Sequence, residues 1–138
     1  MARYYPVSPL FWSDRKVLRW PERARHLALY LLTSEHRNLE GLFRLPLAYI
    51  QADLGWPHEE VSEHMETLTA DDFVAYDADA GVVFLPKALK YHQPKSQKQI
   101  QGAIAVLQQV PDSILWGDFL AAAEEFAPEF HREIKGVP

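Results

Sequence analysis

Apolar residues recur at helical spacing in several separate stretches of the chain. From Pro21 the run PERARHLALYLLTSE predicts a helix, because proline suits the first helical position and Glu22 favours the positive end of the helix dipole. Residues 27–32 are apolar on every side of this helix, and such a helix must be covered all round. The rest of the domain, or a partner, therefore has to surround it.

Two more helices follow with a tight turn between them. Residues 46–54 have one apolar face, and Gly55 supplies the backbone freedom that a helix end needs. Residues 57–69 predict the next helix, with an inner stripe at Val61, Met65 and Leu68. Residues 41–44 form a short extended piece before Pro46, since the residue before a proline avoids the helical region.

Two strand-like runs, at 73–76 and 82–85, are joined by a loop that ends in Gly81, which is typical of a hairpin. The order helix, short strand, helix, tight turn, helix, hairpin is that of a winged helix-turn-helix. We expect one core to contain Leu27, Leu31, Ile50, Leu54, Val61, Leu68 and Phe84.

The tail predicts two further helices. Ser96 and Gln99 match a capping box, and an apolar stripe follows as far as Pro111. A last helix from about Ser113 has its stripe at Leu115, Phe119, Ala122 and Phe126. The fold class is therefore mainly α with a small β-hairpin. It is a single domain over 1–138, with a winged-helix core at about 8–92 and a C-terminal helical extension at about 95–130.

Composition narrows the class of protein. The 138 residues are 48% hydrophobic and 12% aromatic, as in a folded globular domain. The absence of cysteine excludes disulfides, thiolate catalysis and cysteine-ligated zinc. The first ten residues do not resemble a secretory signal, and no apolar stretch approaches the ~20 residues of a membrane span. We expect a cytoplasmic protein with no membrane partner.

Signatures of catalysis and metal binding are absent from the sequence, which has no phosphate loop, GxSxG or HExxH. The neighbours Asp71 and Asp72 would point about 100° apart in a helix and do not form a carboxylate pair. His58 and His64 do not share a helical face, and a Glu60–His64 pair is typical of surface polar pairing. We expect no enzyme activity, no cofactor, no metal and no small-molecule substrate.

Charge is strongly segregated along the chain, although the net charge is only −5. Residues 45–80 contain nine acids and no Lys or Arg, whereas residues 81–101 contain four lysines and no acid. Such segregation is typical of surfaces that meet a protein partner, another copy or a polyanion, but it also arises when outer helix faces are merely acidic.

The acidic segment argues against reading of the major groove by the third helix. Its expected outward residues include Glu59, Glu63 and Glu66, which repel phosphates, because affinity for nucleic acid comes largely from cations. We expect this face to contact protein instead.

The better candidate for DNA is the lysine run of Lys87, Lys90, Lys95 and Lys98. The last two lie beside a predicted helix N-terminus, where free N–H groups accept a phosphate. If the N-terminal segment packs nearby, Arg15, Lys16 and Arg19 extend this run. Two alternatives remain open, namely a solvated connection and a surface that docks onto an acidic protein.

Self-association is a further hypothesis, in the form of a symmetric homodimer. Its apolar anchors are expected among Trp116, Phe119 and Phe126 of the tail, or among the N-terminal aromatics Tyr4, Tyr5, Phe11 and Trp12. If the tail helices instead fold back over the first helix, a monomer results. We expect a set of aromatic residues mainly in the core and its seams, with stacking on single-stranded bases as the alternative: Phe11, Trp12, Trp20, Trp56 and Trp116.

Three motifs carry a family resemblance. FWSD at 11–14, PLAYIQADLGW at 46–56 and VVFLPKALKYHQPKSQKQIQGA at 82–103 resemble the N-terminal domains of DnaD-like and phage replication-initiation (replisome organiser) proteins, over roughly residues 8–126. The resemblance implies a winged-helix domain that binds origin DNA, self-associates or recruits helicase-loading machinery. Such proteins often have Lys or Arg on the third helix, and this chain has none there.

Overall fold

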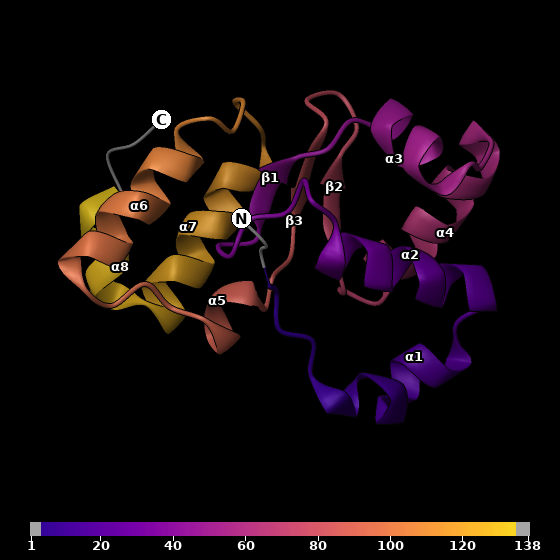
Figure 1. The fold of residues 1–138 in the computed structure, drawn as a ribbon, viewed down its shortest axis with the longest axis horizontal. Coiled ribbons are helices and arrows are strands. Elements are labelled where there is room, and N and C mark those ends of the chain that lie inside the picture. The colour runs from indigo at the N-terminus through magenta and orange to yellow at the C-terminus, as the bar shows by residue number, and fades with distance from the viewer. Residues whose placement is uncertain (1–3, 135–138) are drawn as a thin grey trace.

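The computed structural model describes residues 4–134 and is mainly helical, with one small antiparallel sheet (Figure 1). The N-terminal part contains the 3-10 helix η1 (Pro9–Ser13), α1 (Arg15–Arg19) and α2 (Glu22–Thr33). The middle part contains β1 (Leu42–Arg44), α3 (Leu47–Leu54), α4 (His58–Ala70), β2 (Ala75–Asp77) and β3 (Val82–Phe84). The last part contains α5 (Ala88–Tyr91), α6 (Gln97–Leu107), α7 (Leu115–Phe126) and α8 (Pro128–Ile134).

The helices, the short strand and the hairpin predicted between residues 21 and 85 are present in that order, because local sequence signals set their ends. However, β2 covers residues 75–77 and not 73–76, and β1 joins the hairpin in one sheet. Pro21, Pro46 and Pro57 each lie one residue before a helix, at its N-cap. Gly55 closes α3 in the left-handed conformation, with φ of 71°. The loop after β2 turns through Gly81, whose φ is 67°.

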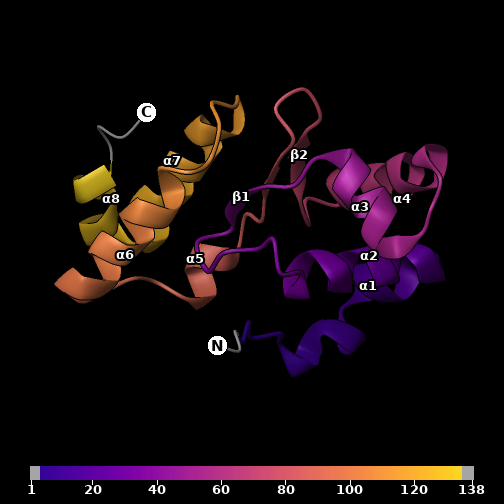
Figure 2. The same ribbon diagram turned by 45° about the horizontal axis from the view of Figure 1, so that its top comes forward.

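The sheet has the strand order β1-β3-β2 and separates two apolar layers (Figures 1 and 2). In both views α2, α3 and α4 lie on one side of the sheet, and α6, α7 and α8 lie on the other. Alternate residues of a strand point to opposite faces. Val83 therefore packs on the α2 side, whereas Val82 and Phe84 pack on the α7 side.

The first layer, here called the N-terminal core, surrounds α2. Ala24, Leu27, Ala28 and Leu31 are fully buried, and the remaining residues of 27–32 are partly buried. The core also contains Ile50, Val61, Leu68 and Val83. The chain itself thus covers the helix that is apolar on every side.

Two residues expected to be buried in the core around α2 are placed differently, and one of them lies in the second layer, here called the C-terminal core. Phe84 belongs to this layer and not to the core around α2, because it alternates with Val83 along β3. Leu54 is only partly buried, at the end of α3. The C-terminal core is rich in aromatic side chains, with Phe119 and Phe130 both fully buried beneath α6 to α8.

The tail contains more helices than the two predicted. The capping box at Ser96 and Gln99 and the break at Pro111 are confirmed. However, α8 follows α7 directly, with Pro128 as its first residue, and buries Phe130 and Ile134. The short helix α5 also precedes α6. Within residues 4–134, no helix is both long and apolar enough to cross a membrane.

Candidate nucleic-acid interface

The N-terminal segment packs beside α5 and encloses a pocket of about 550 Å³ with it. The walls are residues 6–11 with parts of α1, Leu32 near the end of α2, Arg37 in the loop after α2, the turn at 71–73, and residues around α5. We call this cavity the N-terminal pocket. It joins segments that are far apart in the sequence.

Hydrogen bonds at the end of α4 fix the α1 wall of the pocket. The Trp20 indole N–H donates to the Asp71 carboxylate at 2.6 Å, and the Lys16 ammonium donates to the Asp71 carbonyl at 2.9 Å. Asp14 caps α1 by accepting the Lys16 N–H at 2.8 Å. The N-terminal segment is therefore attached to the body of the domain at a defined place.

Arg37 is the buried cation of the pocket. Arg37 is 6% exposed, and its guanidinium donates to the carbonyls of Leu32 and Asn38 at 2.8 and 3.1 Å. The Tyr5 ring lies 5.1 Å from the guanidinium carbon, and the Tyr5 hydroxyl donates to the Arg37 carbonyl. Burial lowers the pKa of Arg37, while Tyr5 and Glu40 act in the opposite direction. Among residues 4–134 no carboxylate forms an ion pair with it.

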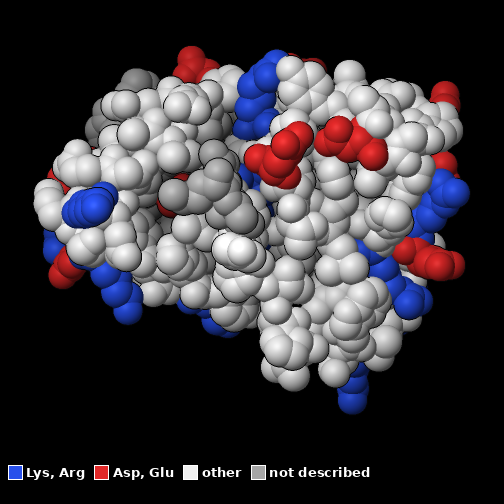
Figure 3. Space-filling model, viewed as in Figure 1, with Lys and Arg blue, Asp and Glu red and all other residues white. Residues whose placement is uncertain are grey.

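The predicted basic residues lie around this pocket to different extents. Lys16 and Lys87 both line it, so the structure brings α1 and the start of the lysine run together. Arg15, Arg19, Lys90, Lys95 and Lys98 are exposed and do not line it. On the face seen in Figure 3, Lys and Arg side chains stand at separate places and form no continuous patch.

Two residues of the lysine run, Lys90 and Lys95, make local contacts. The Lys90 ammonium lies 5.7 Å from the centre of the exposed Tyr91 ring, a cation–π arrangement. At the start of α6, Ser96 accepts the Gln99 N–H, and the Gln99 side chain accepts the N–H groups of Lys95 and Ser96. The capping box therefore already satisfies several donors that a phosphate would use there.

The expected protein-contact residues separate into exposed and buried ones. Glu59, Glu63 and Glu66 are exposed on α4, as expected. Phe119, which was expected to contact a partner, is instead fully buried where α7 packs on its neighbours, and it is not available to a partner. Trp116 and Phe126 are partly buried against the same core, and the Trp116 indole donates to the Pro111 carbonyl at 3.0 Å.

Among residues 4–134, five large apolar side chains are exposed on the N-terminal segment and α5, whereas Tyr49, Val106 and Ile114 are exposed on other parts of the chain. Trp20 and Trp56 are buried as expected, but Trp12 is 53% exposed. In Figure 3 the lobe where Figure 1 places η1 and α1 is covered mainly by uncharged side chains. Large exposed residues in these segments are Tyr4, Leu10, Trp12, Leu18 and Tyr91.

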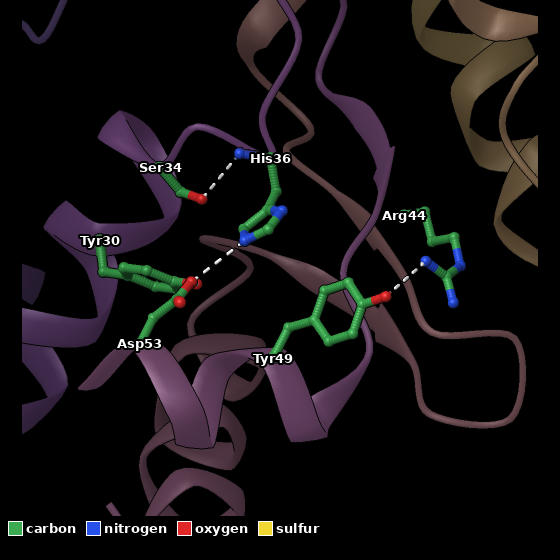
Figure 4. A network of polar contacts seen from close by, with 6 residues as sticks. All are labelled: Tyr30, Ser34, His36, Arg44, Tyr49 and Asp53. Atoms are coloured by element: carbon green, nitrogen blue, oxygen red, sulfur yellow. Dashed lines mark hydrogen bonds and ion pairs between the residues drawn. The ribbon is translucent and has the colours of Figure 1, made fainter. Parts of the chain in front are cut away.

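A polar cluster that the sequence did not reveal lies between the C-terminal end of α2, the loop that follows it, and α3 (Figure 4). Asp53 accepts from the Tyr30 hydroxyl at 2.5 Å and contacts the His36 ring at 3.1 Å. The Tyr30 hydrogen bond is the main cause that lowers the pKa of Asp53, and burial with that bond raises the pKa of Tyr30. Arg44 stacks on the neighbouring Tyr49 ring at 5.3 Å. No motif links these residues, because they come from three separate segments.

Glu60 and His64 of α4 have separate contacts. Glu60 pairs with Arg23 at 2.8 Å, whereas His64 packs against the Trp56 ring at 5.9 Å between centres. Within residues 4–134, His, Asp and Glu side chains form no group of three placed to hold a metal ion.

Comparisons of the chain with protein-family models, with curated proteins and with solved structures found no match in any of the three.

Proposed function

We propose that the protein is a non-catalytic, DNA-associated module of replication initiation, with a winged helix-turn-helix core at about residues 8–92. In this proposal it binds DNA through the lysine run and the basic residues of α1. The assignment to replication follows from the family resemblance, and the manner of binding follows from the charges of the domain.

The order of elements supports the winged-helix assignment. Helix α2, strand β1, helices α3 and α4 and the β2–β3 hairpin follow one another, and Gly55 makes the turn between α3 and α4. This is the order of a winged helix-turn-helix, in which α4 is the recognition helix and the hairpin is the wing.

Charge argues against the usual docking mode of that fold. The exposed side of α4 presents Glu59, Glu63 and Glu66, which repel the two phosphate strands beside a major groove. At the hairpin, Asp79 is exposed, and Asp77 accepts a hydrogen bond from Ser113 at 2.7 Å. Neither element offers the cations that phosphate contacts require.

The observation that most favours the proposal is that Lys16 and Lys87 line the same pocket. They come from the only two parts of the sequence with an excess of basic residues, 1–44 and 81–101. DNA that follows this side of the domain meets α1, α5 and the start of α6, and each phosphate contact releases counterions.

The test is a salt titration of DNA binding, measured by fluorescence anisotropy with single- and double-stranded forms of one sequence. A Lys95→Glu/Lys98→Glu variant should bind more weakly, and each lost phosphate contact should reduce the slope against log salt by about one. The matched control is Arg44→Glu/Arg132→Glu, which changes net charge equally at two exposed sites outside the run. Equal affinity and slope for wild type and the Lys95/Lys98 variant would refute the lysine run as the interface.

A second candidate is a protein-interaction or oligomerisation module, such as a phage-type host-factor or replisome adaptor, without direct DNA binding. The exposed Leu10, Trp12 and Leu18 favour it, since exposed apolar residues that gather in one region are typical of protein contact sites. Light scattering at several concentrations and salt levels tests the homodimer form. A constant mass near 15.9 kDa throughout would exclude it.

A further inference from the structure

The N-terminal pocket combines an apolar body with several groups able to bear positive charge. Leu32, Phe73 and Val17 are among its apolar walls, and its volume of about 550 Å³ is typical of small-molecule sites. Four groups able to bear positive charge also line it, namely Lys16, Arg37, Lys87 and His92, and Lys16 already donates to the Asp71 carbonyl. A ligand that fits both features has an apolar or aromatic body and an anionic group.

Arg37 is the strongest sign that an anion belongs there. A buried arginine is normally paired with a carboxylate, because burying an unpaired charge is costly. Here Arg37 is 6% exposed, forms no ion pair within residues 4–134, and donates only to neutral carbonyls. The buried Glu40 acts on Arg37 without forming an ion pair with it, so among the described residues the guanidinium has no direct anionic partner and can attract an anionic ligand.

The charges on the two ends of the pocket differ and define an orientation. The loop that contains Arg37 is joined to the α5 side, since the Leu85 N–H donates to the Gly41 carbonyl at 2.7 Å. The α1 side contains Asp14, Asp71 and Asp72, where Lys16 and Trp20 already bond Asp71. An anionic group is favoured toward α5, and amino groups that donate hydrogen bonds are favoured toward the aspartates.

An exposed aromatic ring stands beside the cationic end. Tyr91 lines the pocket, yet 68% of its surface is exposed, and Lys90 lies over its ring. Exposed aromatic rings beside lysines are the usual stacking platforms for unpaired bases. A base in a duplex is paired and stacked, and it does not reach such a pocket.

We propose that the N-terminal pocket binds one nucleotide, with the base against Tyr91 and the apolar wall and the phosphate at Arg37, Lys87 and His92. The choice of a nucleotide rests on the function proposed above. Two sources share this chemistry, an unpaired nucleotide within single-stranded DNA and a free mononucleotide. In the first case the protein prefers single strands over duplex.

The experiment measures binding of the full chain to labelled oligothymidylate and to its duplex by anisotropy, and to thymidine monophosphate and thymidine by calorimetry. Tyr91→Ala should weaken single-strand binding roughly tenfold, the usual effect of one lost stacking contact. Its control is Tyr49→Ala, another exposed tyrosine with a cation over its ring, placed outside the pocket. Lys87→Ala/His92→Ala should weaken binding of the monophosphate but not of thymidine.

These side chains reach the surface, so the variants should remain folded, which a melting curve checks. Stronger binding of the single strand, lost in the pocket variants, supports the proposal with DNA as the source. Monophosphate binding that depends on the pocket, without any DNA binding, supports it with a free nucleotide and overturns the proposed DNA function. Equal single- and double-strand binding that depends on Lys95 and Lys98 but not on the pocket supports the DNA function and overturns the nucleotide site. No binding of any probe overturns both.

Discussion

The two cores on either side of the sheet differ in what they enclose. Five polar residues are buried in the part of the chain that the structure describes; Ser34, Arg37, Glu40 and His64 belong to segments on the α2 side, and only Asp77 bonds toward the C-terminal helices, through Ser113. On the other side, Phe119 packs edge-to-face with Phe84 and Phe130, with ring centres 6.1 and 6.5 Å apart. The C-terminal core is thus almost entirely apolar. The N-terminal side contains most of the buried polar groups, and Arg37 among them lines the pocket.

This difference predicts that the largest loss of stability comes from the C-terminal core. Phe119→Ala removes a fully buried ring and should lower the free energy of unfolding by about 3–5 kcal/mol. Ile114→Ala, at a residue that is 84% exposed, should change it by less than about 0.5 kcal/mol. Urea denaturation followed by circular dichroism and by tryptophan fluorescence measures both. Two separate transitions in the Phe119 variant would show that the cores unfold independently, and would contradict a sheet that joins them.

The second largest loss of stability should come from the contact between the loop that contains Arg37 and the start of α5. Gly41 has φ of 84°, and a Cβ there would lie 2.4 Å from the Ala88 Cβ and 3.1 Å from the Leu85 carbonyl. Gly41→Ala should therefore cost about 2–3 kcal/mol, from left-handed strain and overpacking together. Gly102→Ala is the matched control, because α6 leaves open space there, and it should stabilise by about 0.5–1 kcal/mol. If the two variants had equal stability, this wall of the pocket would not be tightly packed.

The polar cluster of Figure 4 should contribute less, because Tyr30 and His36 are only partly buried and Asp53 is exposed. Tyr30→Phe removes the hydrogen bond to Asp53 and should cost about 1 kcal/mol. The Asp53 side chain is 38% exposed, so its ion pair with His36 adds little. The control Tyr49→Phe loses only a 3.3 Å contact with Arg44 at the surface and should cost less than about 0.5 kcal/mol. A double-mutant cycle with Asp53→Asn measures the coupling, and additive effects would show that the bond does not stabilise the fold.

How far the sequence predicted this molecule depended on whether the signal was local. Helix boundaries at Pro21 and Gly55 and the capping box at Ser96 are set by neighbouring residues, and all three were predicted. Helix α1 has five residues, too few to show a helical period, although Asp14 was a readable cap. Helix α8 had a local signal that was missed, a proline followed by apolar residues four apart.

The N-terminal pocket could not be predicted from the sequence, for a different physical reason. Its walls come from four segments between residues 6 and 92, and only tertiary packing brings them together. Arginine is also among the residues least often buried, so no pattern marked Arg37 as a buried cation. Similarly, Phe84 was assigned to the wrong core because an alternating strand with two buried faces gives no sign of which core each residue joins.

The smallest expected effect is a pH dependence at the contact between the hairpin and the C-terminal helices. The Ser113 hydroxyl donates to the Asp77 carboxylate, and this bond is the main cause that lowers the pKa of Asp77. A carboxyl whose folded-state pKa is lowered stabilises the fold above its unfolded pKa of about 3.9, and loses that stabilisation as the pH falls through the folded value. The benefit of the hydroxyl should therefore be greatest near neutral pH.

Ser113→Ala should accordingly lower the melting temperature most at neutral pH, and the difference from wild type should shrink below about pH 3.9. A remainder should persist at every pH, since the Ser113 oxygen also accepts the Leu115 N–H at 3.1 Å at the start of α7. Thermal melts from neutral to strongly acidic pH measure this difference. The exposed Ser13 provides a control, because Ser13→Ala should leave the melting temperature unchanged. A difference that stays constant across the whole range would mean that Ser113 stabilises only the helix and not the charged form of Asp77.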